Sequence, residues 1–124
     1  MGIASYFFDT YAFYEILHGN PNYTPYLTHV SFVTTRLQLM ELYYALLRVK
    51  NKTFAQETYA SLLPYCVDFS DELVWAAMQF KHLHRQKKLS YIDCLGYMIS
   101  LSLHIPFLTG DQQFEGLPSV EFVR

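Results

Sequence analysis

Cysteine is scarce in this sequence, which contains only Cys66 and Cys94, far apart from each other. Neither belongs to a Cys-x-x-Cys pair, and no cluster of cysteine and histidine has the spacing of a zinc site. Both cysteines lie in apolar surroundings, as buried free thiols commonly do. We therefore predict two free thiols and no zinc site.

Long apolar runs are also absent. No stretch approaches the roughly 20 apolar residues that cross a membrane as a helix. The first residues do not resemble a secretory signal, because Asp9 interrupts the only apolar run there and no basic region precedes it. We therefore expect a cytoplasmic protein with no membrane partner.

Charged residues make up only 16% of the sequence, and the formal net charge is −2. A nucleic-acid-binding protein usually carries more positive charge, because phosphate contacts drive its affinity. The basic residues are nevertheless gathered in two places, the first of which is Lys50 with Lys52. The second, called the basic cluster below, comprises Lys81, Arg85, Lys87 and Lys88.

Hydrophobic residues are abundant, at 52% of the 124 residues, and aromatic residues account for 18%. This composition excludes a disordered chain and predicts one domain, residues 1–124, with a sizeable core. Tyrosine and phenylalanine are frequent enough that we expect some of them in an interface with a partner or a second subunit.

Apolar runs of strand length alternate with helical patterns along the chain. The predicted strands are residues 6–9, 30–33, 65–69, 105–109 and 120–123. The predicted helices are residues 11–17, 35–49, 53–64, 71–88 and 91–103, the third opening on a capping box from Thr53 to Gln56. This alternation predicts an α/β fold, a three-layer sandwich in which a mostly parallel five-stranded sheet is flanked by helices.

Three aspartates follow the predicted strands or begin a helix. Asp9 ends the first strand, Asp111 follows the fourth, and Asp93 lies in the first turn of the last helix. Such positions meet at the carboxyl edge of a parallel sheet, where ligands bind. Each has another explanation when taken alone, because Asp9 and Asp111 suit turns and Asp93 suits a capping box with Ser90.

Glu41 has no such explanation. It shares a predicted apolar stripe with Met40 and Tyr44, so its carboxylate should point inward, and an unpaired buried charge costs on the order of several kcal/mol. Four carboxylates at one site favour a divalent cation with oxygen ligands, Mg²⁺ or Mn²⁺, which can activate water and bind phosphate oxygens. Thr10 and Thr109 are candidates to orient these carboxylates, or they are plain hydroxyls at a turn and a strand end.

Four segments, in order, resemble the motifs of the PIN-domain nucleases. They are Phe8-Asp9-Thr10 and then residues 40–48, 89–95 and 107–114, which contain Glu41, Asp93 and Asp111. The resemblance covers nearly the whole chain and is strongest to the VapC-type toxins of toxin–antitoxin pairs. It implies a Mg²⁺- or Mn²⁺-dependent endoribonuclease with these four acids as catalytic and metal-binding residues. It also implies three partners: an RNA substrate, a cognate antitoxin protein and a second copy of the chain in a homodimer.

Other functions are less consistent with the sequence. Haloacid-type phosphatases need a second aspartate two residues after the first, where this chain has Tyr11, and receiver domains need paired acids and a late lysine that are missing. A PIN-like module that binds RNA or protein without cleaving it is the remaining alternative.

The sequence allows more than one role for two further groups of side chains. The basic cluster could guide RNA to the acids, or it is a solvated helix end that matches the helix dipole. Tyr23 and Tyr26 could stack on bases or an antitoxin side chain, or pack in a dimer interface. Trp75 is expected in the core or an interface.

Overall fold

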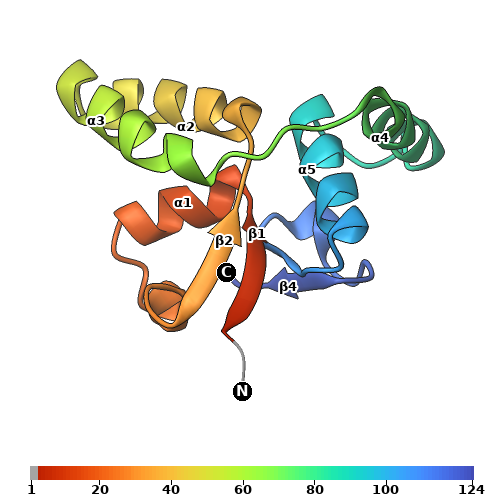
Figure 1. The fold of residues 1–124 in the computed structure, drawn as a ribbon, viewed down its shortest axis with the longest axis horizontal. Coiled ribbons are helices and arrows are strands. Elements are labelled where there is room, and N and C mark those ends of the chain that lie inside the picture. Colours follow the sequence, from red (N-terminus) through yellow and green to blue (C-terminus); the bar gives the residue numbers. More distant parts are fainter. Residues whose placement is uncertain (1–2) are drawn as a thin grey trace.

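The computed structural model describes residues 3–124. Four strands form one parallel sheet in the order β2-β1-β3-β4, as Figure 1 shows in part. The strands are β1 Ala4–Phe8, β2 Val30–Val33, β3 Phe107–Thr109 and β4 Val120–Phe122. The α-helices are α1 Thr10–Leu17, α2 Arg36–Val49, α3 Lys52–Leu62, α4 Asp71–Leu83 and α5 Tyr91–Ser102. The predicted α/β sandwich with helices on both faces of a parallel sheet is confirmed.

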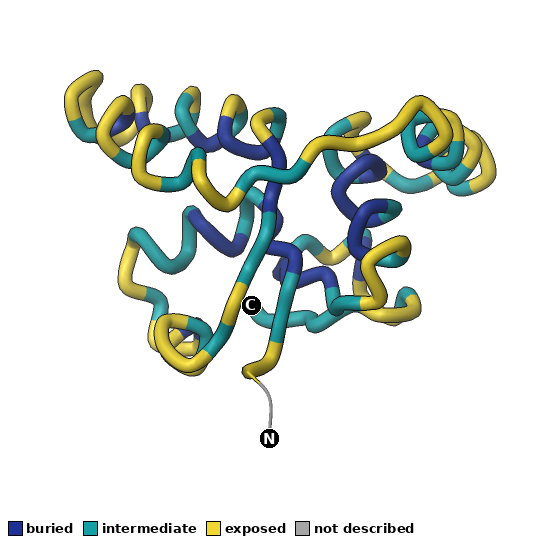
Figure 2. Tube along the Cα trace, viewed as in Figure 1, coloured by how far each residue is buried: buried dark blue, intermediate teal, exposed yellow. Residues whose placement is uncertain are grey.

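Two apolar cores lie on opposite faces of the sheet because neighbouring strand residues point to opposite sides. Phe7 and Phe107 pack against α4 and α5, whereas Phe8 and Leu108 pack against α1, α2 and α3. This arrangement explains why the two inner strands, β1 and β3, carry consecutive apolar residues instead of alternating ones. Figure 2 shows the buried residues along the inner part of β1 and on the facing sides of α1 and α5.

The predicted strand at residues 65–69 is wrong, so the sheet has four strands and not five. The segment makes a single parallel bridge, between Thr34 and Cys66, beside the end of β2. A 3₁₀ turn, Leu63–Tyr65, leads directly into it, and Asp68 and Phe69 are exposed. The segment therefore lacks the buried side chains that would hold it along β2, and the chain leaves the sheet after one residue.

Two helix boundaries also differ from the prediction. Helix α3 begins at Lys52, and its N-cap is Asn51, whose side chain accepts a hydrogen bond from the Phe54 N–H. The capping box predicted at Thr53 is therefore wrong, because the asparagine two residues earlier already satisfies the helix end. Helix α4 ends at Leu83, so most of the basic cluster lies in the turn that follows it.

The structure narrows the places that the sequence left open for three aromatic residues. Tyr23 is fully buried, and its hydroxyl donates to the Val123 carbonyl oxygen at 2.6 Å, so it is not free to stack on a base. Tyr26 donates to the Glu121 carboxylate at 2.6 Å. Trp75 is 60% exposed and so lies outside the core.

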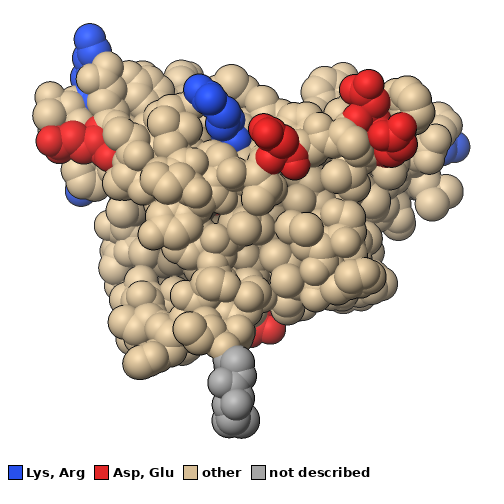
Figure 3. Space-filling model, viewed as in Figure 1, with Lys and Arg blue, Asp and Glu red and all other residues tan. Residues whose placement is uncertain are grey.

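The described residues include no helix that is both long enough and apolar enough to cross a membrane. Cys94 is buried and Cys66 is half-buried, and both are free thiols, as predicted. Charged side chains are sparse on the face of the molecule shown in Figure 3 and lie mostly over the helices at its top.

Candidate active site

Asp9 lies between β1 and α1 and is only 2% exposed. It occupies the N-cap position of α1, but its side chain makes no capping hydrogen bond there. One carboxylate oxygen, Oδ2, accepts a hydrogen bond from the Thr109 hydroxyl at 2.8 Å. The other, Oδ1, is buried and has no hydrogen-bond partner among the described residues. A turn or cap residue would not leave a buried oxygen in this state, so the structure disfavours that explanation of Asp9.

The surroundings of Asp9 oppose its ionisation. Burial above all, together with the nearby carboxylates of Asp93 and Glu41, raises its pKa to about 8, against hydrogen bonds from Thr109 and the Thr10 backbone that lower it. A negative charge here is therefore unfavourable without a compensating positive charge. A cation bound beside Asp9 would supply that positive charge.

Thr109 connects Asp9 to the neighbouring acid, Asp111. The Thr109 hydroxyl donates to Asp9 and accepts a hydrogen bond from the Asp111 backbone N–H at 3.1 Å. Between them, Gly110 has no room for a side chain, since an added Cβ would lie 2.3 Å from both the Tyr11 ring and the Val123 carbonyl oxygen. Asp111 also caps the following 3₁₀ turn, because its Oδ1 accepts from the Gln113 N–H at 3.0 Å.

Asp93 forms the capping box with Ser90 that the sequence offered as its alternative explanation. Its Oδ2 accepts a hydrogen bond from the Ser90 N–H at 3.1 Å, and its own N–H donates to the Ser90 hydroxyl at 3.0 Å. Burial and the nearby charge of Asp111 raise the pKa of Asp93, while Ser90 and Lys81 lower it. The capping bond takes up one carboxylate oxygen and leaves Oδ1 for another partner, so the cap is compatible with a second role at the site.

Glu41 is half-buried, but not for the reason predicted. Met40 and Tyr44 are 54% and 65% exposed, so the stripe that was expected to carry Glu41 inward faces solvent. The buried face of α2 is instead made by Gln38, Leu39, Leu42 and Leu46, and Glu41 lies at its border. The Thr10 hydroxyl donates to Glu41 Oε1 at 2.8 Å. Burial and the charge of Asp93 raise the pKa of Glu41.

Gln38, which the sequence did not single out, joins the helices that carry these acids. It is fully buried, its Nε2 donates to the Ile92 carbonyl oxygen at 3.1 Å, and its Oε1 accepts from the Thr35 hydroxyl. Its backbone carbonyl accepts from the Thr10 hydroxyl at 3.3 Å. Gly96 makes the space, since a Cβ there would lie 2.5 Å from Gln38 Nε2. Helices α1, α2 and α5 therefore meet at one residue, Gln38.

Replacing Gln38 with methionine is expected to lower the free energy of unfolding by about 1–3 kcal/mol. The new side chain has a similar size but leaves the Ile92 carbonyl and the Thr35 hydroxyl without their partner. Urea unfolding measures the change. The same substitution at the exposed Gln79 on α4 is the control and should change stability by less than about 0.5 kcal/mol. Equal effects at both sites would contradict the role assigned to Gln38.

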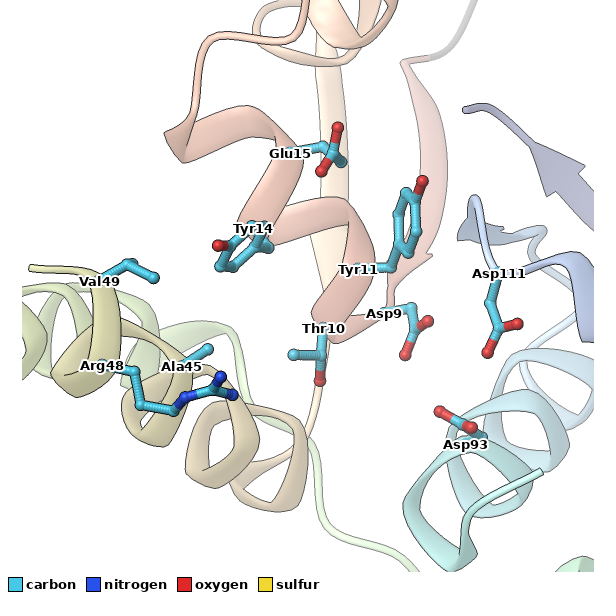
Figure 4. Close-up of a pocket in the computed structure, with 10 residues that line it drawn as sticks. All are labelled: Asp9, Thr10, Tyr11, Tyr14, Glu15, Ala45, Arg48, Val49, Asp93 and Asp111. Atoms are coloured by element: carbon cyan, nitrogen blue, oxygen red, sulfur yellow. The ribbon is translucent and has the colours of Figure 1, made fainter. Parts of the chain in front are cut away.

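The acids border a cavity of about 430 Å³ (Figure 4). Asp9, Asp93 and Asp111 line it directly, whereas Glu41 does not line it but accepts a hydrogen bond from Thr10, which does. The other lining residues are Thr10, Tyr11, Tyr14, Glu15, Ala45, Arg48 and Val49. Sequence reasoning missed Tyr14, Glu15 and Arg48 because no local pattern distinguishes them from ordinary helix surface.

The chemistry of the four acids suits a divalent cation, but their present spacing does not. Within residues 3–124, no three histidine, cysteine, aspartate or glutamate side chains are grouped so as to hold a metal ion. The donors are nevertheless all oxygens, as Mg²⁺ and Mn²⁺ prefer, and Asp9 Oδ1 is buried without a partner. Asp93 and Glu41 raise the pKa of Asp9, and Asp93 raises that of Glu41, which is the repulsion that a cation would relieve.

The basic cluster lies beside the cavity and does not line it. Lys81 donates to the Leu89 carbonyl oxygen, and Lys87 donates to the Gln113 carbonyl oxygen at 3.1 Å. The Arg85 guanidinium donates to the His82 carbonyl oxygen at 2.9 Å, and Lys88 is exposed. Three of the four side chains therefore bond to backbone carbonyls, which favours a structural role, and RNA binding by the cluster stays a prediction.

The sheet order, the helices on both faces and the acids at the carboxyl edge define a PIN-like α/β fold. Solved structures with this fold include VapC20 from Mycobacterium tuberculosis, a sarcin-ricin loop cleaving toxin. That toxin matches with a TM-score of 0.78 at 17% identity, over 96% of this chain and 99% of the toxin. VapBC2 from Rickettsia felis, bound to a DNA fragment from its promoter, matches with a TM-score of 0.71 at 18% identity, over 97% of this chain and 99% of that one.

A toxin–antitoxin complex from Klebsiella pneumoniae also matches, with a TM-score of 0.71 at 14% identity, over 92% of this chain and 93% of that one. No protein-family model and no curated protein matches the sequence. The resemblance to PIN-domain proteins of the VapC type is thus confirmed at the level of the fold.

Proposed function

We propose that the protein is a Mg²⁺- or Mn²⁺-dependent endoribonuclease that hydrolyses RNA phosphodiester bonds. The observation that carries this proposal is the Asp9 carboxylate, which is buried beside Asp93 and Glu41 with one oxygen lacking any hydrogen-bond donor. Such an arrangement is unfavourable in itself and becomes favourable when a cation neutralises it. The VapC fold supports the same conclusion, because a sarcin-ricin loop cleaving toxin shares it.

The four acids have distinct parts in this proposal. Asp9, Asp93 and Asp111 would hold the cation, with Glu41 at the edge of the cavity, and the bound metal would supply an activated water and charge neutralisation at the phosphate. Thr109 fixes Asp9 Oδ2, so that Oδ1 is the oxygen left without a hydrogen-bond donor among the described residues. Thr10 and Ser90 restrain Glu41 and Asp93 in the same way, and a cation would have to bring these carboxylates closer together than they lie here.

We further propose that the protein is one domain spanning residues 1–124 and is the cytoplasmic toxin of a toxin–antitoxin pair. It would form a homodimer and be inhibited by a cognate antitoxin. Support comes from the toxin–antitoxin proteins that share its fold and from the exposed apolar side chains on α2, which suit a protein interface.

Cleavage of RNA should require the metal. Purified protein is expected to cut single-stranded RNA when Mn²⁺ or Mg²⁺ is present and to lose all activity in excess EDTA, with recovery when the metal is restored. Gel analysis of end-labelled RNA measures this. Metal-supplemented wild-type protein that binds RNA but never cuts it would overturn the enzyme proposal in favour of the non-catalytic PIN-like module.

A further inference from the structure

One wall of the cavity carries a positive charge that the metal site does not use. Ala45, Arg48 and Val49 come from the last two turns of α2 and line the cavity together with Tyr14. Figure 4 shows them on the other side of Thr10 from Asp93 and Asp111. The cavity thus has an acidic end and a second end formed by an aromatic ring, two small apolar side chains and a guanidinium. The Glu15 carboxylate, which accepts a hydrogen bond from Asn20, is also in the lining.

Arg48 is the basic side chain in the lining of this cavity, among the residues that the structure describes. Its guanidinium carbon lies 5.8 Å from the centre of the Tyr44 ring, one helical turn earlier. A cation–π contact of this kind restrains an exposed arginine without consuming its hydrogen-bond donors. The guanidinium therefore remains able to bind an anion at the mouth of the cavity.

The identity of that anion follows from the charges around it. The carboxylates at the acidic end repel a polyanion such as RNA, and a bound cation would attract only the phosphate that it contacts. A neighbouring phosphate of the same strand would still need a positive partner. Arginine suits this task, since its planar fork of donors matches phosphate oxygens.

We propose that Arg48 binds a backbone phosphate next to the one that is cleaved. The nucleotide that carries this phosphate would contact Tyr14 and the end of α2. The inference rests on the proposed ribonuclease function. It assigns RNA binding in the cavity to α2 instead of the basic cluster, whose Lys81, Arg85 and Lys87 already donate to backbone carbonyls.

The test measures RNA affinity in protein that cannot cut. In an Asp9→Asn background, a fluorescently labelled single-stranded RNA is titrated at several salt concentrations, and anisotropy gives the dissociation constant. Arg48→Gln should weaken binding about tenfold, as expected for one lost charge-assisted contact, and lower the salt slope by about 0.7. Arg48→Lys should keep part of the affinity, because it retains the charge but not the fork.

Arg36→Gln is the matched control. It lies on the same helix, about 18 Å away along the axis, and does not line this cavity. With Asp9 intact, Arg48→Gln should raise KM and leave kcat nearly unchanged, since a phosphate outside the reacting group is bound equally in the ground and transition states.

The outcomes separate the two proposals. If the wild type cuts RNA but Arg48→Gln binds it as tightly as Arg36→Gln, the Arg48 inference is overturned and the ribonuclease proposal stands. If Arg85→Gln with Lys88→Gln produces the loss and Arg48→Gln does not, the basic cluster is the RNA site. If the wild type neither binds nor cuts RNA, both proposals fall together.

Discussion

Replacing Asp9 with asparagine is expected to reduce metal-dependent RNA cleavage by about a thousandfold, since losing one partner of a buried charge pair costs roughly 4 kcal/mol. Asparagine has almost the same shape and can still accept the hydrogen bond that Thr109 donates at 2.8 Å. What it lacks is the negative charge that would meet a cation. The initial rate of cleavage at saturating Mn²⁺ measures the effect, and isothermal titration of the metal should show weaker binding in parallel.

A matched charge removal elsewhere controls for net charge. Glu57 on α3 is exposed and lies outside the lining of the cavity, so Glu57→Gln should keep both the cleavage rate and the Mn²⁺ affinity of the wild type. If Asp9→Asn cleaves RNA at the wild-type rate, Asp9 is not a ligand of the reacting metal, and the assigned site is wrong even though the fold stands.

The metal-free protein is expected to lose stability as the pH rises from about 4 to about 8. The folded state raises the pKa of Asp9 from 3.8 to about 8, so within this range the native protein holds a proton that the unfolded chain has released. Stability falls with rising pH wherever the native state binds more protons than the unfolded state. The stability that the protonated Asp9 contributes is therefore fully retained below the pKa of Asp9 in the unfolded chain. The difference should amount to a few kcal/mol, measured by urea unfolding in EDTA across the range.

Two variants of this experiment identify the group responsible. Asp9→Asn has no ionisable group at this position, so its stability should vary much less with pH and should exceed that of the wild type at pH 8. Added Mn²⁺ should restore wild-type stability at pH 8, because a ligand that binds only the folded state stabilises it. A wild-type stability curve that stays flat from pH 4 to pH 8 would show that Asp9 is ionised when buried without the metal.

The fold was predictable because its signals are local. The strands are short and rich in aromatic and β-branched residues, and the caps Ser70 and Ser90 mark the starts of α4 and α5. The strand predicted at residues 65–69 failed because sheet pairing depends on what lies beside a segment. An apolar run such as Tyr65 to Val67 has the composition of a strand whether or not a neighbour pairs with it.

The candidate site was predictable where the residues follow strand ends. Asp9 and Asp111 come together because β1 and β3 are parallel neighbours, which the alternation of strands and helices already implies. Glu41 was placed near them on incorrect grounds, because its predicted stripe turned out to be exposed. Gln38 and Arg48 escaped notice, since a bond from α2 to Ile92 or a position in a cavity wall depends on how distant helices pack.

The capping bond of Asp93, beside its proposed role in binding a metal, has a consequence for how this protein could evolve. A lineage that no longer needed catalysis would gain stability by discarding the charge of Asp9, whose surroundings disfavour it. It would not be equally free to discard Asp93, because α5 would lose the bond from the Ser90 N–H at 3.1 Å that closes its first turn. Inactive descendants should therefore keep the Ser90 and Asp93 pair long after Asp9 is gone, so an intact third motif is a poor sign of activity.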